Sequence, residues 1–376
     1  MLDLELSEEQ QLLQDSANRF IEREYDFADR RKAANLEEGF RRSAWKTFAD
    51  LGWLAVGMPE DQGGFGSARE TAVLMEAMGR GLVVEPYLAT VVMAGKTVAL
   101  AGNDAQKDEL LGAVISGDML MSLAHGELKS RYTISHVETR AEGSGDSWVL
   151  NGHKGVVLNG DTAGRLIVSA RTSGATQDED GISLFVVDPK ADGVTVRGYP
   201  TNDGGRAAEV KMENVKALAI LGDEGKAYPV LEEVMDRAAA AICAESLGLM
   251  AVLNDMTTEY AKTREQFGQA IGKFQILQHR MVDMFVALEE SRSLTAVYMA
   301  DVDSSDRDER RYAVSAMKVQ CDKAGRSVGQ EAVQLHGGIA MTDDYSASHY
   351  FKRLSVIARL FGDSDWHLER FADLTR

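Results

Sequence analysis

Residues 260–279 read YAKTREQFGQAIGKFQILQH, and they are the most informative stretch of the chain. They follow the alanine-rich run 238–244, and Gly268 is expected to be the C′ residue that ends a helix over 238–264. Arg264 lies near the end of that helix, where a cation meets the negative end of the helix dipole. The apolar residues that follow recur at intervals of three and four, as in a packed bundle helix: Phe274, Leu277, Met281, Met284 and Leu288.

The periodicity changes twice along the chain. The first 120 residues are typical of helices, and Ser7 before Glu8, Glu9 and Gln10 predicts an N-cap. Between 121 and 225 the sequence turns to short β-type runs: SWVLNG, GVVLNG, RLIVSA, ISLFVV and GVTVRG. From 226 to 376 the pattern is helical again. We therefore expect a mainly α fold with a β insert, in three domains: 1–120, 121–225 and 226–376.

Composition excludes several classes of function. The chain has 41 Lys and Arg against 59 Asp and Glu, a formal net charge of −18, so it offers no basic surface to nucleic acid or anionic lipid. The longest apolar run, AAAAICA at 238–244, is far shorter than a membrane span, and the N-terminus lacks the pattern of a signal peptide. Cys243, Cys321 and the seven histidines show no metal-ligand spacing. We expect a cytoplasmic protein with reduced cysteines and no metal.

Paired glycines mark a second motif, QLHGGIA at 334–340, where a backbone without Cβ atoms can approach another group closely. Alone, it is more simply read as the end of a helix. Three further segments accompany it: MPEDQGGFG at 58–66, EAMGRG at 76–81 and GDEGKAYPVLEEVMDR at 222–237. Together with 260–284, and in this domain order, they resemble the acyl-CoA dehydrogenase family of flavoproteins over nearly the whole chain.

The resemblance implies a helical N-terminal domain, a β-barrel-like middle domain and a C-terminal four-helix bundle that assembles into dimers or tetramers. It also implies FAD, bound across a subunit boundary, with Arg264 on the pyrophosphate, because a guanidinium fork matches phosphate oxygens. The other residues that it assigns to FAD are Gln266, Phe267, Phe274, Gln275 and Leu277, and, from the neighbouring subunit, Gln334, Leu335, Gly337 and Gly338. In this family a carboxylate removes the acyl α-proton, and electron-transfer flavoprotein reoxidises the cofactor.

The catalytic carboxylate is where the sequence departs from the family. Its common position lies in a Tyr-Glu-Gly-Thr-like segment, which here reads Leu360-Phe361-Gly362-Asp363; matching the glycines places Phe361 at the base, and only a shifted alignment offers Asp363. Asp363 is read more simply as a first-turn acid of the last helix.

A second position used in the family is a Glu just before an Arg. Counting forward from Gly225 places Asp236 there, whereas counting back from Arg264 places Ala238 there. Glu245, among apolar residues, is a third carboxylate; a surface position or an intersubunit salt bridge explains it more simply. Asp236 and Asp363 are therefore the candidate bases.

The middle domain departs from the family as well. A loop usually resembling Thr-Glu-Pro-Gly is replaced by 123–130, LAHGELKS, and Val156 and Leu158 replace a flavin-shielding Trp and a hydroxyl residue. We expect FAD-dependent α,β-dehydrogenation of an acyl-CoA, aliphatic or steroidal, by a homotetramer or by one subunit of a heterotetramer with another acyl-CoA dehydrogenase chain. The alternative is a non-catalytic assembly subunit.

Overall fold

The computed structural model describes residues 6–145 and 147–375. The chain divides into two compact units, one formed by residues up to 32, 68–83 and 239 onwards, the other by 33–67 and 84–238. Each unit is described by itself. The fold is mainly helical with one sheet domain, as predicted from the periodicity.

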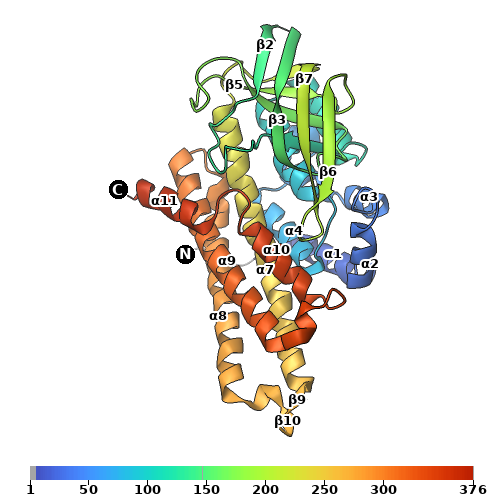
Figure 1. Ribbon diagram of the computed structural model, residues 1–376, viewed down its shortest axis with the longest axis vertical. Coiled ribbons are helices and arrows are strands. Elements are labelled where there is room, and N and C mark those ends of the chain that lie inside the picture. The colour runs from blue at the N-terminus through green and yellow to red at the C-terminus, as the bar shows by residue number, and fades with distance from the viewer. Residues whose placement is uncertain (1–5, 146, 376) are drawn as a thin grey trace. The chain divides into compact units, whose positions relative to one another are not determined.

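The first unit is helical. Its helices are α1 (Glu8–Glu24), α4 (Ala68–Gly81), most of α7 (Tyr228–Thr263), α8 (Gln275–Tyr298), α9 (Arg307–His336), α10 (Ala347–Ile357) and α11 (Ser364–Leu374). Helix α2 (Phe27–Ala34) spans the boundary between the units. In Figure 1, α8 and α9 run alongside α7, and α10 and α11 pack against α9.

Local sequence explains how this bundle begins and how closely it packs. Ser7 caps α1 in a capping box with Gln10, which confirms the predicted N-cap. Where α4 crosses α7, a Cβ added at Gly79 would lie 2.1 Å from the Glu245 carbonyl oxygen, and one at Gly248 would lie 2.0 Å from that of Glu76. Only glycine permits this approach of the two backbones.

Helix α7 is 36 residues long and continuous. An 18-residue window of it has a mean hydropathy of 1.3, so its length and composition would allow it to cross a membrane. However, 78% of that window is buried within the protein, as expected for the core helix of a bundle. Among the described residues, no other helix meets this test.

Apart from the first turns of α7, the helices that lie wholly in the second unit precede its sheet. They are α3 (Arg42–Asp50), the short 3₁₀ turns η1 (Trp53–Ala55) and η2 (Glu60–Gln62), η3 (Leu88–Gly95), α5 (Lys96–Ala101) and α6 (Asp104–Ile115). Helical structure was expected throughout the first 120 residues, and η3 and α5 agree with that expectation, but η3 has π-helical hydrogen bonding. The Thr90 hydroxyl donates to the Met121 carbonyl at 3.0 Å, which fixes η3 to the first strand.

The sheet has eight strands: β1 (Met121–Ala124), β2 (Arg140–Ser144), β3 (Ser147–Leu158), β4 (Arg165–Arg171), β5 (Ile182–Val187), β6 (Val194–Pro200), β7 (Arg206–Lys216) and β8 (Ala219–Leu221). Their order is β6-β7-β3-β2-β4-β5-β8, with β1 parallel to β4. Trp148 and Phe185 pack in its core with ring centroids 5.4 Å apart. The runs SWVLNG and GVVLNG, which we expected as separate strands, form the single strand β3, whose pairing with β7 shifts register between Leu150 and Gly152 and again between Lys154 and Val157.

Candidate functional site

Arg264 and the residues after it form a β-hairpin, β9 (Glu265–Gln266) and β10 (Gln269–Ala270), at the end of α7. Its two-residue loop, Phe267-Gly268, has positive φ at both positions, 55° and 78°. The expectation that Gly268 is a C′ residue is wrong: α7 ends at Thr263, and Gly268 turns the hairpin. Figure 1 shows this hairpin at one end of the bundle, between α7 and α8.

The hairpin presents a cation and an aromatic ring to solvent. The Arg264 backbone is fixed, since its N–H donates to Tyr260 O and its carbonyl accepts from Ile271 N, both at 2.8 Å. Its guanidinium is exposed, and no ion pair involves it among the residues that the structure describes. Phe267 is 92% exposed, and its ring meets that of Phe274 edge-on at 6.1 Å.

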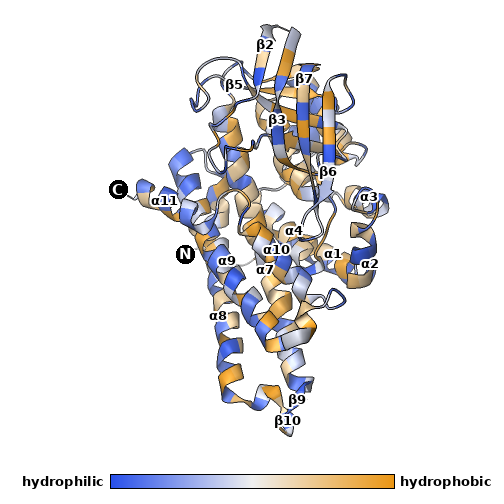
Figure 2. Cartoon of the chain, viewed as in Figure 1, coloured by the Kyte–Doolittle hydropathy of each residue, from blue (hydrophilic) through white to orange (hydrophobic). Residues whose placement is uncertain are grey.

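The other predicted FAD residues of this segment lie at the start of α8. Phe274 is the N-cap residue of α8, preceded by the 3₁₀ turn η4 (Ile271–Lys273), Gln275 is its exposed first residue and Leu277 is half-buried. Exposed apolar residues continue along this helix, and Figure 2 shows hydrophobic and hydrophilic positions mixed along it. They are Ile276, Val282, Phe285 and Val286.

The second predicted motif lies where α9 ends. Gln334 is exposed and Leu335 is buried, and Gly337 follows the helix with φ 66°. A Cβ added at Gly337 or Gly338 would meet no atom within 4 Å, so the backbone here is open to another molecule. The 3₁₀ turn η6 (Gly337–Met341) continues the chain.

An aromatic stack joins this motif to the end of α7. The ring of His336 lies 4.6 Å from that of Tyr260 and 5.2 Å from that of Tyr345, measured between centroids. Its Nδ1 is hydrogen-bonded to the Ala332 carbonyl at 2.8 Å, so Nδ1 carries the proton. Burial lowers the pKa of His336. The structure thus brings the two FAD motifs of one chain close together.

Asp363, one candidate base, is the N-cap residue of α11. Its Oδ1 accepts from the Trp366 N–H at 3.1 Å, and its other oxygen lies 3.7 Å from Arg359. This is the helix-terminal arrangement that residue type alone favoured. Phe361, two residues earlier, has a left-handed backbone with φ 57° and is followed by Gly362 at φ 106°.

Asp236, the other candidate, is a buried residue of α7. Its neighbour Arg237 is bonded to Glu233 at 2.9 Å, one helical turn back. Because α7 is a continuous α-helix through this region, Asp236 and Ala238 project about 200° apart around its axis. Counting forward from Gly225 therefore places the face of α7 that carries Asp236 at the base position, whereas counting back from Arg264 places the face that carries Ala238 there.

Glu245 is neither a surface residue nor free for an intersubunit salt bridge, the two explanations that the sequence favoured. It is 5% exposed, and its carboxylate pairs with Arg353 of α10 through two bonds of 2.6 and 2.7 Å. The apolar sequence around it is explained by this bidentate pair within one chain.

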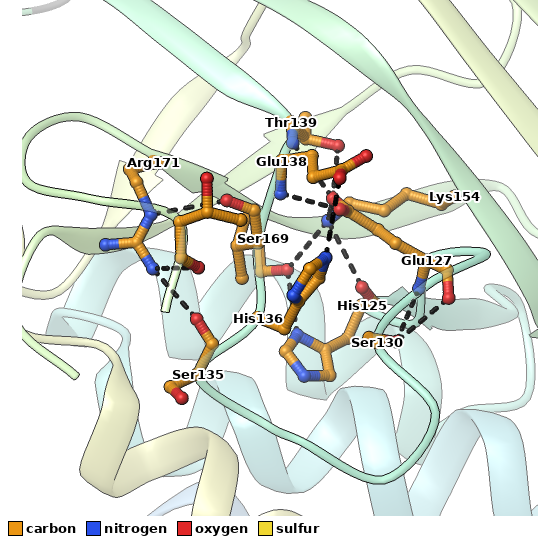
Figure 3. A network of polar contacts seen from close by, with 12 residues as sticks. His125, Glu127, Ser130, Ser135, His136, Glu138, Thr139, Lys154, Ser169 and Arg171 are labelled. Carbon is orange, nitrogen blue, oxygen red and sulfur yellow. Dashed lines mark hydrogen bonds and ion pairs between the residues drawn. The ribbon is translucent and has the colours of Figure 1, made fainter. Parts of the chain in front are cut away.

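The replaced loop of the middle domain carries a buried ion pair that sequence reasoning missed (Figure 3). Lys154 Nζ lies 2.7 Å from Glu127 Oε1 and also bonds the His125 carbonyl and the Ser169 hydroxyl. Thr139 donates to the same Glu127 oxygen through its N–H at 2.9 Å and its hydroxyl at 2.7 Å. A lysine inside a strand pattern was the only signal in the sequence.

Electrostatics keep this pair charged. Burial lowers the pKa of Lys154 to about 8, although Glu127 opposes the shift. Burial alone would raise the pKa of Glu127, but Lys154 and Thr139 lower it to about 2.

The ligand atoms of three residues of this loop region lie within 4.8 Å of one another: Glu127, His136 and Glu138. The Glu127 oxygens are already engaged by Lys154, Thr139 and the Glu138 N–H, so this cluster is not a built metal site.

Val156 lies on a bulge of β3. The register with β7 shifts between Lys154 and Val157, and Val156 has φ 52°, which is unusual for a β-branched side chain. Its side chain is 60% exposed, and Leu128 of the replaced loop is also exposed. The bulge thus presents this position outward, with valine in place of a larger ring.

Comparison with known proteins supports the family resemblance. Sequence models of the acyl-CoA dehydrogenase N-terminal, middle and C-terminal domains match residues 7–118, 122–215 and 226–374. The mitochondrial isovaleryl-CoA dehydrogenase of Oryza sativa subsp. japonica is 30% identical, covering 84% of this chain and 78% of its own. The chain belongs to the acyl-CoA dehydrogenase family. A 3-(aryl)acrylate reductase of Clostridium sporogenes is 27% identical over 96% of both chains.

Two similar solved structures carry paired names, and one of them is a complex. A variant of the Tcur3481–Tcur3483 steroid ACAD shares 29% identity, with a TM-score of 0.86 over 98% of both chains. The ChsE4–ChsE5 complex from Mycobacterium tuberculosis shares 25% identity, with a TM-score of 0.87 over 99% of this chain and 98% of that one. Members of the acyl-CoA dehydrogenase family bind FAD.

The residues present fit the dinucleotide end of FAD. An exposed guanidinium without an ion-pair partner among the described residues suits a pyrophosphate, and the open backbone at Gly337 and Gly338 leaves room for a ligand. Both features belong to the first unit. In the second unit, Val156 and Leu158 offer no hydrogen-bond donor from their side chains to a flavin ring.

Proposed function

We propose that this chain is one subunit of a heterotetrameric, FAD-dependent acyl-CoA dehydrogenase, and that a second chain of the family supplies the catalytic carboxylate. Family membership supports α,β-dehydrogenation of an acyl-CoA as the overall reaction. The observation that carries the subunit role is Phe361, an apolar residue on a positive-φ turn at the position where the family usually has its base.

The candidate carboxylates of this chain support a partner-supplied base. Asp363 is engaged in capping α11, and moving it to the acyl α-carbon would cost that hydrogen bond. Asp236 is a buried residue of α7. It matches the family's base position only when the sequence is aligned from Gly225, and not when it is aligned from Arg264. Asp is also one methylene shorter than Glu, and a displacement of about 1 Å can cost roughly a hundredfold in rate.

Retention of the FAD motifs argues against an inert assembly subunit. Arg264 would hold the pyrophosphate, and Gln266, Phe267, Phe274, Gln275 and Leu277 would contact the same dinucleotide. Gln334, Leu335, Gly337 and Gly338 would approach FAD from the adjoining subunit. When bound, FAD supplies the acceptor for the hydride that leaves the acyl β-carbon. Electron-transfer flavoprotein would then take up the electrons.

The substrate and compartment follow from the same proposal. One similar structure is the ChsE4–ChsE5 complex, and another, Tcur3481–Tcur3483, is named a steroid ACAD. We place this chain in the same group, acting on a bulky, steroid-like acyl thioester in the cytoplasm. Aliphatic acyl-CoA esters are the comparison substrates in any assay.

Isosteric substitutions in the complex test where the base lies. This chain is co-purified with a second family member that has a glutamate at either base position, and reduction of FAD by acyl-CoA is followed anaerobically. Asp236→Asn and Asp363→Asn should leave the rate within about twofold. Replacement of the partner's glutamate by glutamine should lower it about a thousandfold, within the range for general-base catalysis. A hundredfold loss from either substitution in this chain would show that the chain carries its own base.

A further inference from the structure

The 357–363 turn, between α10 and α11, is held by a buried cation. Lys318 of α9 has a fully buried side chain, and its Nζ lies 2.8 and 2.7 Å from the two carboxylate oxygens of Asp322. The same ammonium bonds the carbonyl oxygens of Ile357 at 3.2 Å and Gly362 at 2.9 Å. Lys318 therefore ties both ends of the turn to α9.

A histidine provides a second tie. His367 is buried, and its Nε2 lies 3.0 Å from the Phe361 carbonyl oxygen, which can only accept. Nε2 is therefore protonated, and Nδ1 accepts from the Ser315 hydroxyl at 3.2 Å. Burial lowers the pKa of His367 to about 3, with Lys318 and Arg370 acting in the same direction, so the ring stays neutral at pH 7.

The backbone of the turn is strained and tightly enclosed. Phe361 has φ 57°, a conformation that costs a non-glycine residue free energy and persists only where its surroundings impose it. A Cβ added at Gly362 would lie 2.5 Å from the Trp366 side chain and 2.7 Å from that of His367, so glycine is required there. Such strained positions cluster at functional sites. The side chain at position 361 nevertheless carries no titratable group.

We infer that Lys318 and His367 are positioning residues for a retained active-site turn, and that a carboxylate placed at position 361 would restore the missing base. This inference rests on the proposed function. In Phe361→Glu, the introduced carboxylate would take the acyl α-proton and become a carboxylic acid. The hydride from the β-carbon, with its two electrons, would pass to bound FAD, which is reduced as the acyl group becomes an α,β-unsaturated thioester.

The first test is gain of activity in the purified chain loaded with FAD. Acyl-CoA should reduce the flavin of the Phe361→Glu variant at least a hundredfold faster than that of wild type. Phe361→Gln introduces a side chain of the same shape without the charge, and its flavin should be reduced at the wild-type rate. The pH profile of the gain should follow a carboxylate. The titratable and charged groups around the turn are the same in both variants: Lys318, Asp322, Arg359, Asp363 and His367. A difference between the pH profiles of the two variants therefore reports on position 361. Equal rates in the two variants at equal FAD content would overturn the inference.

The second test asks whether the ties position the turn. In the Phe361→Glu background, Lys318→Met with Asp322→Leu replaces the buried ion pair rather than breaking it, which buried pairs commonly tolerate. We expect at least a tenfold loss of the gained rate and faster amide hydrogen exchange at Leu360 and His367, with FAD content within twofold. A retained rate and unchanged exchange would contradict the positioning role.

His367 offers an independent pair of variants in the same background. His367→Gln can still donate to the Phe361 carbonyl and should keep most of the gain, whereas His367→Leu cannot and should lose it at least tenfold. Equal rates in these two variants would count against His367 as a positioning residue.

The failure of the inference and that of the proposed function are distinguishable. If acyl-CoA rapidly reduces the FAD bound to the wild-type chain alone, the proposed function fails. If the wild-type chain is inert and Phe361→Glu is inert too, with FAD bound, only the inference fails. If the chain alone does not retain FAD, the same comparison is made in the complex with the partner's glutamate replaced by glutamine.

Discussion

Glu245 of α7 and Arg353 of α10 form a bidentate ion pair inside the helical bundle. The bonds from Nε and Nη2 to the two carboxylate oxygens are 2.6 and 2.7 Å long, and the Glu245 side chain is almost fully buried. This pair gives a structural role to a carboxylate that, in an apolar stretch of sequence, could also have been catalytic.

Removing one partner of this pair should therefore cost stability. Glu245→Gln leaves the Arg353 charge partly buried without its carboxylate, and we expect a loss of about 3 kcal/mol in the free energy of unfolding. Replacing both residues with methionine should cost less than the single change. Urea or thermal unfolding measures both. Glu259→Gln, in the exposed Lys262–Glu259 pair, is the control and should cost under about 1 kcal/mol. A Glu245→Gln protein as stable as wild type would contradict this role.

Arg264 should govern FAD retention. Arg264→Ala removes a charged, forked donor from the proposed pyrophosphate contact, so FAD should bind roughly 10- to 100-fold more weakly. Arg264→Lys should recover part of the affinity, because it keeps the charge and loses the fork. Lys262→Ala, an exposed cation two residues away, is the control and should bind FAD normally. Equal FAD content in Arg264→Ala and Lys262→Ala preparations would contradict a contact between Arg264 and the pyrophosphate.

His125 should make stability fall in mild acid. Burial, with Lys154 nearby, lowers its folded-state pKa to about 3, below the unfolded value of about 6.5. The unfolded chain therefore binds more protons between these values, so this stabilisation is present above pH 6.5 and is lost as the pH falls toward 3. At pH 5 the loss is about 2 kcal/mol.

Thermal unfolding of two variants isolates the contribution of His125. His125→Gln can keep a hydrogen bond to Ser169, which His125 Nδ1 makes at 2.9 Å, and should show a smaller drop in Tm between pH 7 and pH 5. His279→Gln, at an exposed position, should follow wild type. If His125→Gln and wild type lose the same Tm, His125 is not responsible.

The order of helices and strands was predictable because it rests on local periodicity. Ser7 and Gln10 specify a helix start by themselves, and the apolar spacing after Phe274 specifies a bundle helix. Gly268 was misjudged because glycine serves helix ends and hairpin turns alike, and only the pairing of Gln266 with Gln269 distinguishes the two. The merging of two runs into β3 likewise depends on its partner strand β7, which lies far along the chain.

The site was predictable only where a motif carries it. Arg264, Gly337 and Gly338 stand in recognisable segments, and the structure leaves them open to a ligand. The ion pairs Lys154–Glu127 and Lys318–Asp322 depend on burial, and in the first of them the two residues are 27 positions apart. Lys318 further bonds carbonyl groups about 40 residues away, a contact that no local pattern encodes.

Reduction of FAD in the purified chain tests the central claim most directly. The wild-type protein, loaded with FAD and free of any other family member, is mixed anaerobically with steroid-like and aliphatic acyl-CoA esters while the flavin absorbance is recorded. We predict that the flavin stays oxidised in the chain alone and is bleached when the partner chain with its glutamate is present. Full bleaching in the chain alone would contradict the claim that the base comes from a second subunit.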